Sequence, residues 1–152
     1  IGGPSEFSTV AERFDGYRDA LAAYQLAFDA NLATVGDFSL ASGWRAIAEL
    51  LARAADIDAV FAANDLMAIG VIQYLDKQGV KTPDAIAVAG FDDIPLAAWY
   101  QPALTTIRQP VYELGQHAVR MLLERKNHPY EQCKEKRLKP LLIVRCSTGR
   151  RT

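Results

Sequence analysis

Two hydrophobic patterns alternate along the chain. Short runs of consecutive apolar residues are typical of strands buried on both faces of a sheet. Longer stretches with apolar residues three and four positions apart are typical of amphipathic helices. The short runs predict strands at 58–63, 86–91 and 104–107, and a further short strand in the sequence LATVGDF. The longer stretches predict helices at 42–55, 65–78 and 95–100.

The first predicted helix follows a short opening strand and a Gly-Gly-Pro turn. Thr9 and Glu12 have the spacing of a capping box, which predicts the helix start there. The apolar stripe of this helix is predicted to contain Val10, Phe14, Tyr17, Leu21 and Tyr24. The buried face of the helix at 42–55 is predicted to contain Trp44, Ile47, Leu51 and Ala54. Gly79 is expected to end the helix at 65–78 as a C-terminal cap.

The alternation of strands and helices predicts an α/β fold. Helices of about 10–15 residues between buried strands indicate βαβ units and a parallel sheet with helices on both faces, a three-layer sandwich. After Pro110 the pattern changes to a helix, a polar turn and a long extended stretch that Pro140 interrupts, as in a strand that crosses between two sheets. The residues of this helix predicted to face inward are Leu114, Ala118, Met121 and Leu122.

The charge balance argues against direct nucleic-acid binding by this segment. The 152 residues, about one domain, include 17 Lys and Arg and 18 Asp and Glu, for a formal net charge of −1. Non-specific nucleic-acid binding depends on an excess of cationic charge. The one basic cluster, at 134–139, is mixed with glutamates and is interpreted as a solvated edge strand. Neither Cys133 nor Cys146 has the spacing of a metal site, which favours structural thiols in a reducing compartment.

No apolar run approaches the ~18 residues of a membrane span, so no membrane association is expected. No signal peptide is visible either, but that absence carries no weight because the chain opens at Ile1 without Met.

Two predicted strands end at acidic residues, in the sequences AAND and GFDD. Ligands of open α/β sheets bind beyond the carboxyl ends of the strands, and one carboxylate can accept from both of two vicinal sugar hydroxyls. Asp65 directly precedes an apolar helical run and is expected to be a helix N-cap. Asp93 is expected to turn the chain. Asn64 and Asp92 lie at the strand tips and are expected to contact a ligand.

Two further residues are candidates for the same site. Arg13 lies in the second turn of the first helix, and its five donors match ring hydroxyls or a carboxylate. A surface salt bridge to Glu12 or Asp15 explains Arg13 equally well. Phe38 lies in a turn, where an aromatic ring can stack on a sugar or a base, although a core position is the commoner role for such a residue.

Catalytic and cofactor motifs are missing from the sequence. It contains no GxSxG nucleophile elbow, P-loop, HExxH or GxGxxG. His117 and His128 are far from the acidic strand tips and are interpreted as surface residues. We therefore expect no enzyme activity, no cofactor and no metal.

Five stretches together resemble the lactose/galactose-repressor (LacI/GalR) family of bacterial transcription regulators. They are ERFDGYRDAL, GDFSLASGWRA, AVFAANDLMAIGVIQYL, IAVAGFDDIPLAAWYQPALTTIRQPVYELGQHAVRMLL and LKPLLIVRCST. The resemblance is collinear and covers nearly the whole chain. It implies the C-terminal lobe of a two-lobed core like a type I periplasmic binding protein. Residues 1–109 and 141–152 would form that lobe, and 110–140 would be a crossover helix and strand of the N-terminal lobe.

The resemblance also implies an effector site. The residues at its ligand-binding positions are Arg13, Phe38, Asn64, Asp92 and Gln109. Phe7 departs from the purine-responsive member, which has an arginine there, so the resemblance favours a sugar over a purine. Ile69 and Tyr100 correspond to positions at the dimer interface of the family, and we expect exposed apolar faces around them.

The implied function is the effector-binding and dimerisation region of a cytoplasmic transcriptional repressor. A sugar or sugar phosphate would bind between the lobes and change the affinity of a homodimer for operator DNA, through an N-terminal head absent from this segment. One alternative is a periplasmic sugar receptor of a transporter. Another is a small α/β enzyme with Asp65 and Asp92 as its acid–base pair.

Overall fold

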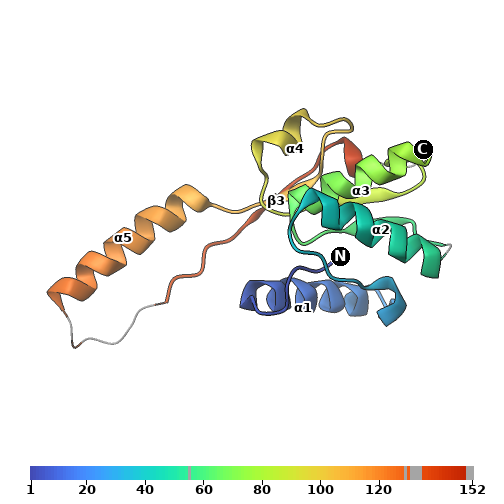
Figure 1. Ribbon diagram of the computed structural model, residues 1–152. Helices are drawn as coiled ribbons and strands as arrows, with labels where there is room; N and C mark the ends of the chain where they lie inside the picture. Colours follow the sequence, from blue (N-terminus) through green and yellow to red (C-terminus); the bar gives the residue numbers. More distant parts are fainter. Residues whose placement is uncertain (55, 129, 131–134, 150–152) are drawn as a thin grey trace.

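The computed structural model describes residues 1–54, 56–128, 130 and 135–149 (Figure 1). Cys133 and part of the basic cluster lie outside these described residues. The elements in chain order are α1 (Ser8–Ala23), the 3₁₀-helix η1 (Ala30–Leu32), α2 (Leu40–Arg53), β1 (Ala59–Phe61), α3 (Asp65–Lys77), β2 (Ala87–Ala89), α4 (Pro95–Trp99), β3 (Thr106–Arg108), α5 (Val111–Asn127), β4 (Leu141–Ile143) and the 3₁₀-helix η2 (Cys146–Thr148).

The sheet is mainly parallel, as predicted. β1 pairs with β2 in register Val60 to Val88, and a single parallel bridge from Ala89 to Thr105 extends the sheet toward β3. On the other side of β1, the amino group of Ile1 donates to the Phe61 carbonyl at 2.7 Å. β4 pairs antiparallel with β3. The carboxyl ends of the parallel strands therefore meet at one side of the sheet, which we call the carboxyl edge.

The strand predicted in LATVGDF is wrong beyond one residue. Val35 makes a single parallel bridge to Gly2, Leu32 is the last residue of η1, and the residues between them are in no helix or strand. The partner segment turns away at Gly3 and Pro4, and proline has no N–H to donate to a ladder. The strand pairing therefore cannot continue beyond this bridge.

The hydrophobic core lies between the sheet and the helix pair α2 and α3. Its largest fully buried apolar side chains are Ile47, Met67, Ile69, Leu75 and Leu104. α3 ends as predicted, with Gly79 at a φ of +73°. Helices lie on both sides of the sheet: in Figure 1, α1 is below the N-terminal segment and α2 and α3 are above it.

The buried face of α2 is rotated from the predicted one. Ile47 is buried as expected, but Trp44, Leu51 and Ala54 are only half-buried. The buried residues are instead Ser42, Gly43, Ala46, Ile47 and Leu50. The cause is a close helix crossing, because a Cβ on Gly43 would overlap the backbone of Met67 in α3.

α1 starts earlier than predicted and packs less deeply. The N-cap is Phe7, without a side-chain capping bond, so the capping box of Thr9 and Glu12 is wrong. Of the predicted stripe only Val10 is buried. Phe14, Tyr17 and Phe28 instead pack on one another, with ring centroids 5.6–6.4 Å apart.

α5 extends away from the rest of the structure (Figure 1). None of its residues is buried, so the predicted inward face, including Leu114 and Leu122, is exposed among the described residues. β4 then returns the chain to β3. The assignment of 110–140 to a second lobe stays a prediction. No helix in the described part of the chain is long and apolar enough to span a membrane.

We expect Gly43→Ala to lower the free energy of unfolding by about 3 kcal/mol, because the added methyl forces α2 away from α3. Chemical denaturation measures this change. The matched control is Gly16→Ala in α1, where nothing lies within 4 Å of an added Cβ. That variant should gain about 0.5–1 kcal/mol from helix propensity. Similar effects in both variants would contradict the close crossing.

Candidate functional site

Asn64 caps α3 at the end of β1. Its side-chain oxygen accepts from the Met67 N–H at 2.9 Å, and its side-chain N–H₂ donates to the Phe38 carbonyl at 2.9 Å. The predicted N-cap, Asp65, is therefore wrong by one residue. Both polar atoms of Asn64 are engaged, which leaves one N–H and one lone pair for a ligand. Its ligand role stays a prediction.

Asp65 is the first residue of α3, and its side chain is fully buried. Its carboxylate accepts from the Ile94 N–H at 2.9 Å and from the Thr106 hydroxyl at 2.5 Å. Burial raises the pKa of Asp65, the negative charges of Asp92 and Asp93 raise it further, and the two hydrogen bonds oppose the change. Asp65 thus joins α3 to the start of α4 and to β3, and it does not face a ligand.

Asp92 and Gln109 meet at the carboxyl edge. The Gln109 side-chain N–H₂ donates to the Asp92 carboxylate at 2.8 Å. The Asp92 side chain is 35% exposed, so its carboxylate is still open to further donors. Its backbone has a φ of +112°, a conformation that is rare for residues other than glycine.

Arg13 reaches the same place from α1. Its guanidinium donates to the Ala63 carbonyl at 2.8 Å, lies 3.9 Å from the centroid of the Phe91 ring and is 4.0 Å from the Asp92 carboxylate. The charged partner of Arg13 is therefore Asp92, rather than Glu12 or Asp15 on its own helix. The separation from Asp92 is too long for a direct hydrogen bond.

Phe38 borders this group through its backbone, whose carbonyl holds Asn64. Its φ is +66°, and its ring lies 5.9 Å from that of Phe7. Phe7 is half-exposed, so the two rings form an apolar wall that includes the residue by which the chain departs from the purine-responsive member.

All five predicted ligand residues are thus linked by a continuous series of contacts. Gln109 touches Asp92, Arg13 lies beside Asp92 and holds the carbonyl before Asn64, and Asn64 holds Phe38. This shared location supports the site, whereas the ligand role of each residue stays a prediction. Among the described residues, no three His, Cys, Asp or Glu side chains form a group that could hold a metal ion.

Two arginines at this edge were missed from the sequence. Arg108 and Arg145 both form ion pairs with Asp93, at 2.5 and 2.6 Å. Asp93 does turn the chain, with a φ of +57°, but its carboxylate also has this second role. No local motif marks the pairing, because the arginines follow Asp93 by 15 and 52 positions.

Ile69 does not lie on a surface. Its side chain is fully buried in the core, so the expected exposed apolar face around it is wrong, because α3 is covered by both the sheet and α2. Tyr100 is half-buried, and burial raises its pKa. The exposed apolar surface beside Tyr100 belongs to α4, where Trp99 is 82% exposed.

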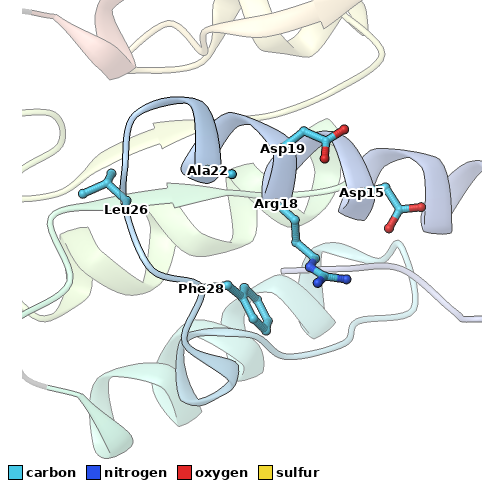
Figure 2. Close-up of a pocket in the computed structure, with 6 residues that line it drawn as sticks. All are labelled: Asp15, Arg18, Asp19, Ala22, Leu26 and Phe28. Atoms are coloured by element: carbon cyan, nitrogen blue, oxygen red, sulfur yellow. The ribbon is translucent and has the colours of Figure 1, made fainter.

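A hollow of about 520 Å³ lies apart from the carboxyl edge. Figure 2 shows its lining side chains on α1 and the loop that follows: Asp15, Arg18, Asp19, Ala22, Leu26 and Phe28. None of the predicted ligand residues lines it, and it holds no buried polar group directed inward. We do not assign the effector site to this hollow.

Comparison with known proteins identifies the family. The model of the periplasmic binding protein-like domain matches residues 1–148. The chain belongs to this family. It is 41% identical over 125 residues to the HTH-type transcriptional regulator CelR of Thermobifida fusca, covering 82% of this chain and 37% of CelR. It is 39% identical over 147 residues to the ribose operon repressor of Escherichia coli, covering 97% of this chain and 44% of the repressor.

Solved structures agree with this assignment. A structure of the CelR–cellobiose complex matches with a TM-score of 0.93 at 38% identity, over 97% of this chain and 45% of that one. The lac repressor dimer bound to operator and the anti-inducer ONPF matches with a TM-score of 0.88 at 29% identity, over 97% and 44%. The resemblance to LacI/GalR regulators and the predicted α/β fold are confirmed. The chain spans less than half of each of these relatives, which are named as transcriptional regulators or repressors.

Replacing Asp65 separates its structural role from the binding site. Asp65→Ala should lower the free energy of unfolding by about 2–3 kcal/mol, because it leaves the Ile94 N–H and the Thr106 hydroxyl unpaired. Asp65→Asn should cost much less, because an amide can accept from the N–H and donate to the hydroxyl. Equal losses, measured by chemical denaturation, would contradict this role.

The pH dependence of stability gives a second readout on Asp65. Because its folded pKa is raised, the folded state binds the proton more tightly than the unfolded state. The associated stabilisation is complete below the unfolded pKa of about 3.9 and is lost as the pH rises through the folded pKa. Asp65→Asn should remove this component from a series of denaturation curves between these pH values. A profile that keeps the same slope would argue against the raised pKa.

Proposed function

We propose that this chain is the effector-binding part of a transcriptional repressor, and that its effector is a sugar or a sugar phosphate. The observation that carries the proposal is the meeting of Arg13, Asp92 and Gln109 at the carboxyl edge. This is where ligands bind in open α/β sheets, and these side chains come from α1, the β2–α4 loop and the end of β3.

The geometry suits hydroxyl groups. Arg13 and Asp92 are 4.0 Å apart, so a hydroxyl placed between them can accept from the guanidinium and donate to the carboxylate. The Asp92 carboxylate accepts from Gln109 through one oxygen only. Its other oxygen is available for a second, neighbouring hydroxyl, as in a pyranose or furanose ring.

The arginines at this edge are all paired with carboxylates. Asp92 lies opposite Arg13, and Asp93 opposite Arg108 and Arg145. Each of these arginines has a carboxylate partner, but Arg108 and Arg145 share Asp93, so the edge carries three arginines against two carboxylates and can accommodate a sugar or a sugar phosphate. The apolar wall of Phe7 and Phe38 offers the C–H face of a sugar a surface to pack on.

The relatives support the same class of effector and the same role. One is described as a complex with cellobiose, another as the repressor of the ribose operon, and a third as a dimer bound to its operator. By analogy, we propose a homodimer whose operator affinity changes with the sugar, in the cytoplasm where the DNA lies, and without catalysis. Because these relatives are regulators, they favour a repressor over a periplasmic receptor.

The proposed mechanism is a reciprocal coupling between two sites. A sugar that contacts Arg13, Asp92 and Gln109 touches both the packed lobe and the segment leading into α5. It would thereby change the placement of the second lobe. Coupling free energies of this kind are typically about 1–3 kcal/mol, and operator DNA must weaken an inducing sugar as much as the sugar weakens DNA binding.

Arg13→Ala and Asp92→Ala in the full-length regulator should each reduce sugar affinity by about 2–5 kcal/mol, because the partner groups stay buried and unpaired. Isothermal titration with cellobiose and with D-ribose measures this loss. Glu49→Gln is the control, because it removes an exposed carboxylate that pairs with Arg53 at 3.4 Å, away from the edge. Unchanged affinity in both alanine variants would remove the site.

An operator-binding assay distinguishes a transcriptional repressor from a periplasmic sugar receptor. In a gel-shift assay on the promoter of the regulator's own operon, the sugar should change operator affinity of the full-length dimer. A protein that binds the sugar but no promoter DNA would favour the receptor instead.

A further inference from the structure

Both carboxylate oxygens of Asp93 are engaged at the carboxyl edge. One carboxylate oxygen accepts from Arg145 at 2.6 Å, and the other accepts from Nε of Arg108 at 2.5 Å. The side chain is only 5% exposed. Burial alone would raise the pKa of Asp93, but the hydrogen bonds and charges of Arg145 and Arg108 hold it below its usual range. Asp93 therefore has no free oxygen for a ligand, unlike its neighbour Asp92.

The two arginines mark the points where the chain leaves and re-enters the packed lobe. Arg108 is the last residue of β3, directly before Gln109, Pro110 and α5. Arg145 follows β4, by which the chain returns. Arg145 is itself fixed, because its guanidinium also donates to the Leu104 carbonyl at 2.8 Å and its N–H donates to the Thr105 hydroxyl at 2.8 Å. The Asp93 carboxylate thus binds one arginine at the point where the chain leaves the packed lobe and another where it returns.

The same carboxylate lies next to an unfavourable backbone. Asp92 and Asp93 are consecutive residues with φ values of +112° and +57°. Such conformations cost about 1–3 kcal/mol each and persist only where the surroundings impose them. The Asp92 N–H donates to the Ile107 carbonyl at 2.9 Å, but the Asp93 N–H makes only a long bond, of 3.3 Å, to the Thr106 hydroxyl. The ion pairs of Asp93 therefore restrain this turn in addition to the hydrogen bonds on either side of it, from the Asp92 N–H to the Ile107 carbonyl and from the Ile94 N–H to Asp65.

This backbone decides where Asp92 points. The turn sends the two neighbouring carboxylates in different directions, Asp93 to the two arginines and Asp92 to Gln109 and Arg13. We propose that Asp93 is a positioning residue for the effector. Its ion pairs with Arg108 and Arg145 orient the Asp92 carboxylate and couple it to the end of β3, which leads into α5, and to the segment that follows β4. This inference rests on the proposed function, because it assigns Asp93 a role in the binding of a sugar by Asp92.

A double-mutant cycle in the full-length regulator tests the inference. Cellobiose and D-ribose are titrated into the unmodified protein and into Asp93→Asn, Asp92→Asn and the double variant. Asp93→Asn should weaken sugar binding about tenfold in the unmodified background and less than about twofold in the Asp92→Asn background, since residues that act through one contact are not additive. An equal loss in both backgrounds would show that Asp93 serves the fold alone and would overturn the inference.

Amide hydrogen exchange gives a readout that needs no sugar. In Asp93→Asn the Asp92 amide should exchange at least about tenfold faster, while core amides such as those of Ile47 and Val71 stay unchanged, because only the local restraint is lost. An unchanged rate at Asp92 would overturn the positioning role. Faster exchange throughout the core would also overturn it, because the variant would then act on global stability.

A second variant tests the inference with less risk of misfolding. Arg108 is 52% exposed, so Arg108→Gln removes one arm of the interaction at little risk to the core. It should weaken sugar binding about threefold and accelerate hydrogen exchange at the Asp92 amide. Both effects should be smaller than in Asp93→Asn, because one of the two ion pairs remains. Glu49→Gln serves again as the control. Unchanged affinity and exchange in folded Arg108→Gln would contradict the inference.

The outcomes separate this inference from the proposed function. If Asp92→Asn binds both sugars as well as the unmodified protein does, or if neither sugar binds, the proposed effector site fails. The exchange rate of the Asp92 amide then still decides whether Asp93 holds the turn. If Asp92→Asn loses affinity and Asp93→Asn does not, the site stands and only the positioning role is removed.

Discussion

One buried carboxylate organises the carboxyl edge. Asp65 accepts from the backbone of Ile94 and from the side chain of Thr106, so it fixes the start of α4 and the start of β3 against the start of α3. A Cβ on Gly90 would overlap the same carboxylate, which explains why glycine ends β2 at this point. Burying a carboxyl group without partners would cost several kcal/mol. The fold therefore depends on both hydrogen bonds being made.

The four polar residues of AAND and GFDD have separate tasks because of this constraint. Both oxygens of the buried Asp65 carboxylate accept hydrogen bonds. Asn64 caps α3, and Asp93 binds two arginines. Only Asp92 keeps an exposed carboxylate. The negative charges of Asp92 and Asp93 both raise the pKa of Asp65, so the arginines around them also protect the interior from accumulated negative charge. The charged residues proposed to bind the effector thus also affect the buried carboxylate of Asp65, on which the fold depends.

Local patterns predicted most of the fold and the acidic strand ends of the proposed site, but they could not assign separate roles to Asn64, Asp65, Asp92 and Asp93. The apolar runs and helical spacing predicted β1, α3 and β2 in the correct order, and Gly79 marked the end of α3. The start of α1 was missed because Phe7 packs against Phe38, a contact across 31 positions that overrides the local capping signal. The face of α2 was missed because a glycine contact with α3 sets its rotation. The assignments of Asn64 and Asp65 differ by one residue, which is within the uncertainty of any helix boundary drawn from sequence.

The position of the site within the packing suggests why it suits regulation. The core between the sheet and the α2–α3 pair is dense, whereas α1 buries one residue and α5 buries none. Arg13 belongs to α1, and Gln109 directly precedes the segment that leads to α5, so two of the three proposed polar contacts come from elements outside the core between the sheet and the α2–α3 pair. A ligand can shift an equilibrium only by its difference in affinity for the two states. Contacts that join the core to elements outside it can supply that difference, whereas contacts on the core alone would bind a sugar without changing the placement of the second lobe.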